Sequence, residues 1–197
     1  LEHGGVTSDL VGPTVTAAAA YGVPVVVRVP SADRALIGWL CDQGVAGVMV
    51  PRIESLAQAK EVSSYFDYPP VGQRGVASYT RAARWGSRPL EDLCRPVFMP
   101  QIETPGALEE VGEIAALNGV DALFIGPLDL SYALNVPAQL DNASFISAFD
   151  RIIQAAQAHS VPVGSIAADD ARAASMRDRG VDFLALGSDG VMLRQGL

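Results

Sequence analysis

The sequence predicts an α/β protein of the (β/α)₈ barrel class with a parallel sheet. Short apolar runs alternate with segments of helical periodicity along the 197 residues. The runs are nearly continuous in apolar character, which is typical of parallel strands covered on both faces. Polar residues stand at the carboxyl ends of several runs, which is where barrel enzymes gather their catalytic groups. This convergence favours a barrel over a doubly wound sheet.

Six apolar runs predict the strands, and they span residues 23–29, 45–51, 96–103, 120–126, 161–167 and 181–187. No Gly-x-Gly-x-x-Gly motif follows the first run, which weakens the alternative of a dinucleotide-binding fold. A closed barrel needs two further strands, and these would have to precede Leu1. We therefore expect a single barrel domain over residues 1–197 that lacks its first two strands.

Helical segments connect the predicted strands. Asp33–Gln43 has apolar residues near helical spacing and ends before Gly44, a common helix stop. Thr104–Leu117 places Pro105 at the first helical position, where proline is favoured. Residues 145–159 and 169–179 complete the predicted set.

Composition excludes several classes of partner. The net charge of −8 argues against a nucleic-acid partner, because phosphate binding needs a basic surface. No apolar run approaches the roughly 20 residues of a membrane span. Cys41 and Cys94 are too few for a disulfide framework or a zinc motif and are typical of reduced thiols. We expect a cytoplasmic protein without nucleic-acid or membrane partners.

Two acids follow neighbouring predicted strands. Glu103 and Asp129 lie 26 residues apart, one helix and one strand along the chain. In a barrel their strands are about 4.8 Å apart, so both carboxylates can reach one point. Two carboxylates that close repel one another, and a divalent cation such as Mg²⁺, Mn²⁺ or Co²⁺ would remove the repulsion. The alternative is that Glu103 pairs with an arginine and Asp129 caps the next helix.

An anion-binding element accompanies the predicted metal site. Residues 126–129 open a helix, whose free backbone N–H groups can bind an anion. Arg28, at the end of the first run, can bind a carboxylate through two parallel hydrogen bonds. A metal beside an anion site suits a 2-oxo acid, whose enolate the metal would stabilise. Lys60, the only lysine, lies in a helical pattern, so a Schiff-base mechanism lacks a candidate.

Several motifs resemble those of one enzyme family. They are EHGG (2–5), VVVRVP (25–30), VMVPRIES (48–55), YPPVGQRGVASYTRAARWG (68–86) and PQIETPGALEEVGEIAALNGVDALFIGPLDLS (100–131). In this order and spacing they resemble the HpcH/HpaI family of class II, metal-dependent pyruvate aldolases over essentially the whole chain. The resemblance implies a (β/α)₈ barrel that assembles into homotrimers or homohexamers. It also implies reversible cleavage of a 4-hydroxy-2-oxo acid, or a 2-dehydro-3-deoxy sugar acid, to pyruvate and an aldehyde through a metal-bound pyruvate enolate.

The resemblance also implies roles for individual residues. Glu103 and Asp129 fall on the family's metal ligands, in agreement with the inference from strand ends. Arg28 falls on the family's catalytic arginine, which binds the pyruvate unit and stabilises its enolate. Gln101 falls on a nearby polar position of the substrate-binding site. Gly126 and Leu128 fall on the backbone donors to its carboxylate.

A histidine completes the site that the resemblance implies. His3 falls on the family's histidine, which acts in proton transfer, and Asp42 is expected to be its partner carboxylate. A histidine beside an acid is a suitable base near neutral pH. The alternative for His3 is a terminal residue without a catalytic role.

The longest irregular segment covers residues 68–93 and contains Arg74, Arg81, Arg84 and Trp85. Loops of this length in compact domains are usually functional or disordered. The resemblance implies a lid or subunit-contact segment near the mouth of the active site. A solvated basic loop is the alternative.

Two other functions remain open from the sequence. A citramalyl-CoA or malyl-CoA type lyase shares the enolate chemistry, although no nucleotide-binding motif is visible. A non-catalytic 2-oxo-acid-binding subunit would use the same anion site without turnover. A phosphate-binding isomerase is less consistent with the sequence, because no glycine-rich phosphate loop occurs near the last strands.

Overall fold

A computed structural model describes residues 1–196, and its centre is one parallel sheet of six strands in the order β1-β2-β3-β4-β5-β6. The strands are β1 (Val26–Arg28), β2 (Gly47–Val50), β3 (Val97–Ile102), β4 (Leu123–Ile125), β5 (Val163–Ala167) and β6 (Phe183–Leu186). Each strand lies within one predicted run, and every neighbouring pair is parallel as predicted. The sheet forms a half-barrel with β1 and β6 at its edges.

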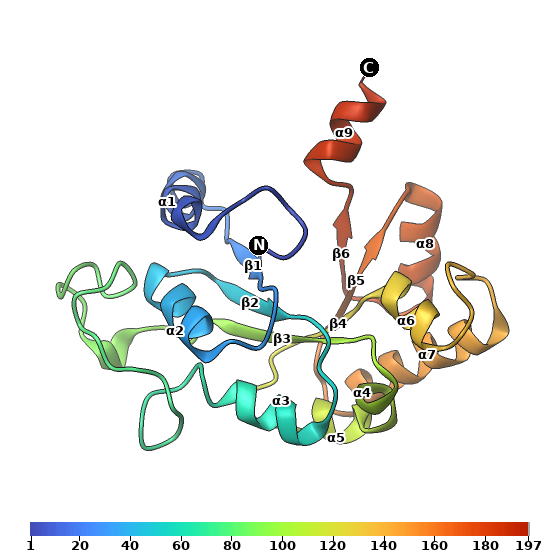
Figure 1. The fold of residues 1–197 in the computed structure, drawn as a ribbon, viewed down its shortest axis with the longest axis horizontal. Helices are drawn as coiled ribbons and strands as arrows, with labels where there is room; N and C mark the ends of the chain where they lie inside the picture. Colours follow the sequence, from blue (N-terminus) through green and yellow to red (C-terminus); the bar gives the residue numbers. More distant parts are fainter. Residues whose placement is uncertain (197) are drawn as a thin grey trace.

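Helices connect the strands, and most of them lie along the outer side of the curved sheet (Figure 1). They are α1 (Val11–Ala20), α2 (Arg34–Gln43), α3 (Leu56–Ser63), α4 (Pro105–Glu109), α5 (Val111–Ala115), α6 (Pro127–Ala133), α7 (Ala143–Ala158), α8 (Asp170–Arg179) and α9 (Asp189–Gln195). Helix α9 extends away from the rest of the molecule beyond β6. No described helix has the length and apolar character needed to cross a membrane.

The residues predicted to begin and end two of the helices do so in the structure. Asp33 caps α2 by accepting a hydrogen bond from the backbone N–H of Leu36, and Gly44 ends the helix with φ of 78°. Asp169 and Gly180 begin and end α8 in the same way, with φ of 104° at the glycine. Both glycines adopt the left-handed backbone conformation that other residues rarely do. Helix α1 lies outside the predicted set because its Ala- and Thr-rich sequence has only a weak amphipathic pattern.

The core lies between the sheet and its outer helices. Phe98 of β3 is fully buried and packs on Phe66, with ring centroids 5.1 Å apart. Ile37 and Leu40 of α2 and Ile152 of α7 are also fully buried. Burial of such side chains contributes roughly 1.5–3 kcal/mol each. This packing holds the strand ends in place for the site described below.

The prediction of one helix over Thr104–Leu117 is wrong, because the segment forms α4 and α5 with a break at Glu110. The Glu110 carboxylate accepts a hydrogen bond from the backbone N–H of Leu56, at 2.6 Å. Gly106 of α4 lies against the backbone of Glu54, where an added Cβ would be 2.1 Å from the carbonyl oxygen. Contacts to the beginning of α3 therefore shape this segment, and local helix signals do not reveal them.

Gly106→Ala is expected to destabilise the protein by about 2 kcal/mol, because the new methyl group would clash with backbone rather than with a mobile side chain. Gly112→Ala is the matched control, since nothing lies within 4 Å of its Cβ position in α5. That change is expected to stabilise by about 0.5–1 kcal/mol. Urea unfolding of both variants measures the difference. Equal stabilities would contradict the close approach at Gly106.

Candidate active site

Glu103 stands at the carboxyl end of β3 and is only 4% exposed. Its Oε1 accepts a hydrogen bond from the backbone N–H of Arg52, at 2.8 Å. Its Oε2 accepts one from Nε2 of Gln101, at 2.9 Å. The carboxylate is therefore fixed by groups from the ends of two neighbouring strands.

Glycine at position 126 makes room for this carboxylate. Ile102 of β3 pairs with Ile125 of β4, so Glu103 and Gly126 follow at the same level. A Cβ at Gly126 would lie 1.9 Å from Glu103 Oε2 and 3.2 Å from Gln101 Nε2. Any side chain at this position would displace the acid.

Burial raises the pKa of Glu103 from its ordinary value of 4.5 to about 7. The hydrogen bond from Arg52 opposes this rise, the negative charges of Asp129 and Glu2 add to it, and the Arg28 guanidinium lowers the pKa. Asp129 lies in the first turn of α6, directly after β4, and its side chain is exposed. These charged groups therefore act on one another at the carboxyl ends of β1, β3 and β4.

Glu2 connects the first residues of the chain to β1. Its Oε2 lies 2.9 Å from Nε of Arg28, and the backbone nitrogen of Leu1 donates to the Arg28 carbonyl oxygen at 3.0 Å. His3 Nε2 lies 3.6 Å from the other carboxylate oxygen of Glu2, and its side chain is 71% exposed. Glu2 was not among the predicted site residues, although its position beside His3 in the EHGG motif was a usable signal.

Within one chain, Asp42 does not lie beside His3, the residue that it was predicted to partner. Asp42 lies in the last turn of α2, which leads to the amino end of β2. Its Oδ1 lies 2.7 Å from Nη2 of the buried Arg74. The acid beside His3 is Glu2, because the first residues of the chain contact Arg28 at the carboxyl end of β1.

The oxygen atoms at this edge fit a divalent cation. Gln101 Oε1 is buried and has no hydrogen-bond partner among the described residues. Glu103 and Asp129 supply two carboxylates whose mutual repulsion a cation would relieve. The described residues contain no cluster of three or more His, Cys, Asp or Glu with metal-site geometry.

The first turn of α6 supplies backbone donors beside these acids. Gly126 precedes the helix and Pro127 begins it. The N–H groups of Leu128 and Asp129 point out of the first turn and have no intrahelical acceptor. Gly126 is buried and Leu128 is exposed, so these residues extend from the floor of the site to its rim.

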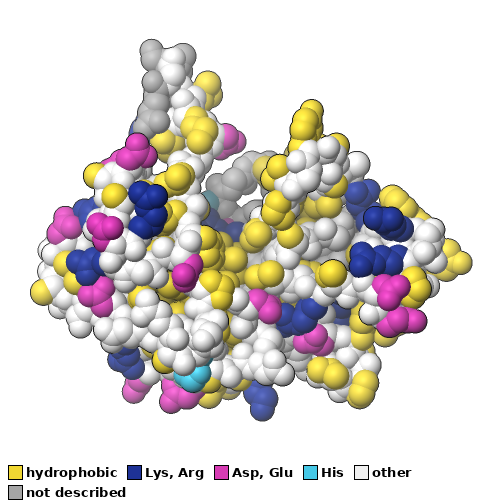
Figure 2. Space-filling view, turned by 180° about the vertical axis from the view of Figure 1, so that it is seen from behind, with side chains coloured by type: hydrophobic (Ala, Val, Ile, Leu, Met, Phe, Trp, Pro, Cys, Tyr) yellow, Lys and Arg dark blue, Asp and Glu magenta, His cyan; other side chains and the backbone are white. Residues whose placement is uncertain are grey.

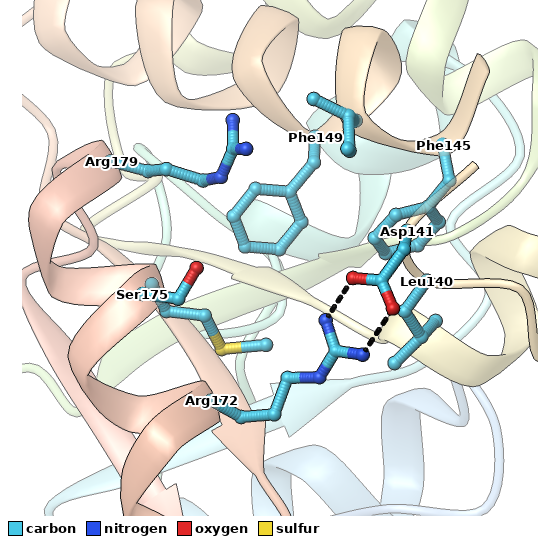
Figure 3. A pocket seen from close by; sticks show the side chains of 9 residues that line it. Leu140, Asp141, Phe145, Phe149, Arg172, Ser175 and Arg179 are labelled. Carbon is cyan, nitrogen blue, oxygen red and sulfur yellow. Dashed lines mark hydrogen bonds and ion pairs between the residues drawn. The ribbon is translucent and has the colours of Figure 1, made fainter. Parts of the chain in front are cut away.

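A different pocket lies between α7 and α8 (Figure 3). Arg172 binds both carboxylate oxygens of Asp141, at 2.8 and 2.9 Å, and these bonds lower the pKa of that acid. Phe145 and Phe149 fill the space behind the ion pair, which leaves a cavity of only about 40 Å³. This region is a helix–helix contact without room for a substrate.

Comparison with known proteins identifies the family. The family model described as HpcH/HpaI aldolase/citrate lyase matches residues 9–196. The chain belongs to this family. The hydroxypyruvate/pyruvate aldolase of Delftia acidovorans is 38% identical over 98% of the chain and 74% of the relative. The 2-keto-3-deoxy-L-rhamnonate aldolase of Klebsiella pneumoniae is 34% identical over 92% of the chain and 69% of the relative.

A solved structure supports the same relationship. The HpcH/HpaI aldolase/citrate lyase family protein from Burkholderia cenocepacia is 32% identical, with a TM-score of 0.93 over 99% of this chain and 79% of that chain. The family predicted from the motifs is thus confirmed, and with it the prediction of an aldolase-type carbon–carbon lyase. The class II aldolases of this family typically depend on a divalent metal.

The raised pKa of Glu103 predicts a pH dependence of stability in metal-free protein. Between its ordinary value of 4.5 and its folded value of about 7, the folded state binds more protons than the unfolded state. The free energy of unfolding should therefore fall as pH rises from 4.5 through 7, by about 3 kcal/mol, and then level off. Glu103→Gln should lack this contribution. Urea unfolding of both proteins with chelator at pH 5 and pH 8 measures it, and parallel pH profiles would contradict it.

Gly126→Ala is expected to push the Glu103 carboxylate out of place while leaving the fold intact. Aldol cleavage should fall by roughly 100-fold, because a misplaced ligand loses the charge stabilisation of the site. Gly38→Ala in α2, where nothing lies within 4 Å of the new Cβ, is the control and should retain activity. Unchanged turnover in Gly126→Ala would show that the position of Glu103 is not important.

Proposed function

We propose that Glu103 and Asp129 form the metal site of a class II aldolase that cleaves a 4-hydroxy-2-oxo acid reversibly to pyruvate and an aldehyde. The observation that carries this assignment is the buried Glu103 carboxylate, fixed by two hydrogen bonds and yet destabilised by burial and by Asp129. Such an arrangement is costly without a cation and useful with one.

The metal of this proposal is Mg²⁺, Mn²⁺ or Co²⁺, because a site of carboxylate and carbonyl oxygens suits these hard cations. When bound, it would polarise the 2-oxo acid and stabilise the negative charge that develops as the carbon–carbon bond opens. Gln101 orients Glu103 through its Nε2 donor and leaves its own Oε1 available within the site.

Arg28 is proposed to bind the pyruvate unit. Its side chain is 38% exposed, so a small anion can approach it from solvent. The contact with Glu2 restrains Nε, which leaves the terminal nitrogens for the substrate. The N–H groups at Gly126 and in the first turn of α6 are proposed to bind the pyruvate carboxylate, since helix N-termini favour anions.

His3 is proposed to move the proton of the substrate hydroxyl. Its imidazole is exposed beside the Glu2 carboxylate, which can stabilise the protonated ring. Glu2 would then contact both the proton-transfer group and Arg28, so it is proposed as the positioning acid in place of Asp42.

The relatives suggest the range of substrates and the assembly. They include proteins named for pyruvate, hydroxypyruvate and a 2-keto-3-deoxy sugar acid, so we propose pyruvate as the common product. We also propose that the half-barrel is the greater part of an eight-stranded barrel, and that the protein functions as a homotrimer or homohexamer. The likeness in fold to the Burkholderia cenocepacia structure supports the barrel.

Asp129→Asn and Glu103→Gln are expected to lose metal binding and activity together, because each removes one of the two carboxylates. Titration with Mn²⁺, followed by electron paramagnetic resonance, measures metal binding. Exchange of the pyruvate methyl protons in D₂O, followed by NMR, measures formation of the enolate separately from aldehyde chemistry. Both readouts should fall by roughly 100-fold or more.

Asp178→Asn is the matched control, since this exposed acid of α8 lies away from the strand ends. It should bind Mn²⁺ and exchange pyruvate protons like the unchanged protein. If Glu103→Gln exchanged these protons at the normal rate in the presence of chelator, the metal-site assignment would be wrong.

A further inference from the structure

A second cavity, of about 370 Å³, lies at the amino edge of the sheet. Its wall includes Gly44–Ala46, which lead into β2, and Pro96, which precedes β3. Glu103 lies at the other end of β3, so this cavity is separate from the candidate active site. Helix α1, the last turn of α2 and the long segment between α3 and β3 form the rest of the wall.

Four arginines from the long segment line this cavity, namely Arg74, Arg81, Arg84 and Arg88. No Asp or Glu of residues 1–196 lines it. This concentration of positive charge stands out on a protein with a net charge of −8. Figure 2 shows several Lys and Arg side chains, with Asp and Glu side chains beside them, on the side of the molecule that carries the long segment in Figure 1.

Nearby acids leave most of this charge uncompensated. Asp42 contacts Arg74 from outside the lining, at 2.7 Å. Within the described part of the chain, no carboxylate lies in ion-pair contact with Arg81, Arg84 or Arg88. Arg88 donates instead to the backbone carbonyl of Asp92.

Two buried donors at the cavity lack acceptors. The side chain of Arg74 is 3% exposed, and its Nε has no hydrogen-bond partner in the described structure. The Nε of Arg81 is also buried without a partner, although its Nη2 donates to Thr16 Oγ1 at 2.6 Å. A buried N–H without an acceptor costs roughly 1–3 kcal/mol, so native proteins rarely leave one unpaired. The guanidinium groups of Arg74 and Arg81 therefore have unused hydrogen-bonding capacity beside the cavity.

Aromatic rings restrain these two arginines. The guanidinium carbon of Arg74 lies 4.6 Å from the ring centroid of Tyr68, and that of Arg81 lies 5.6 Å from the ring centroid of Trp85. Stacking of this kind reduces the entropy that a guanidinium loses when it binds a ligand. The donors are therefore held in position before any ligand arrives.

We propose that this cavity binds a compact polyanion, either a phosphate compound or a small polycarboxylate. Guanidinium groups match the oxygens of both through paired hydrogen bonds. The volume falls within the range of small-molecule sites in proteins, which is roughly 300–1,000 Å³. This site does not depend on the proposed aldolase chemistry.

Cys94 offers a direct readout of binding. It is exposed and lines the cavity, whereas Cys41 on the same wall is buried, which raises its thiol pKa to about 11 and keeps it unreactive. N-ethylmaleimide is uncharged and should modify Cys94 selectively. Inorganic pyrophosphate or citrate should slow this modification by roughly tenfold at saturation, relative to chloride at equal ionic strength. Peptide mass spectrometry identifies the modified thiol.

A comparison of the two anions shows which chemical class of ligand the cavity binds. Protection by pyrophosphate alone indicates a phosphate compound, and protection by citrate alone indicates a polycarboxylate. Calorimetry with the protective anion should show affinity falling by roughly 100-fold in the double variant Arg81→Gln/Arg84→Gln, which loses two charge-assisted contacts. Arg84→Gln alone changes an exposed side chain and should weaken binding by roughly tenfold without affecting folding.

Arg177→Gln on the exposed surface of α8 removes the same charge away from the cavity and should bind like the unchanged protein. The proposal is overturned if neither anion protects Cys94, or if the double variant binds as tightly as Arg177→Gln. It is also overturned if a crystal structure of the assembled protein shows an acidic side chain of a neighbouring copy in the cavity.

Discussion

The active-site edge of this protein depends on burial of the Glu103 carboxylate. A buried acid is stable only when other groups hold its charge, and the fold supplies a backbone N–H from Arg52 and an amide from Gln101. The absence of a side chain at Gly126 leaves the space that Glu103 Oε2 occupies. The parallel register of β3 and β4 brings these two positions to the same level. The two hydrogen bonds, the glycine and the register all accommodate the Glu103 carboxylate.

The unfavourable energy of the charged, buried Glu103 carboxylate is consistent with a functional role. The two hydrogen bonds do not restore the ordinary acidity of Glu103, because burial raises its pKa to about 7 and Asp129 adds to the rise. Perturbed pKa values of this kind cluster at functional sites. Membership of the HpcH/HpaI aldolase/citrate lyase family gives this costly arrangement a purpose, since a cation would convert repulsion between the acids into binding.

The two ends of the sheet differ in charge and in the origin of their side chains. At the carboxyl ends of the strands, Glu103, Asp129 and Glu2 form an acidic site beside Arg28. At the amino edge, the long segment between α3 and β3 contributes four arginines to one cavity. Asp42 belongs to this second end because the last turn of a helix in a βαβ unit leads to the beginning of the next strand. A helix position and a strand end that are close in sequence can therefore lie at opposite edges.

Local sequence determined the strands, most of the helices and the family of this protein, because apolar runs, helix caps and short motifs act over a few residues. It also placed Glu103, Asp129 and Arg28 at strand ends, which parallel topology brings together at one end of the sheet. The family resemblance added Gln101 to the same site. Only the tertiary structure decided the break between α4 and α5, the contact of Glu2 with Arg28 and the pairing of Asp42 with Arg74. These depend on side chains that meet from elements 26 to 54 residues apart. The free energy of such contacts is set by three-dimensional packing, which has no local signature in the chain.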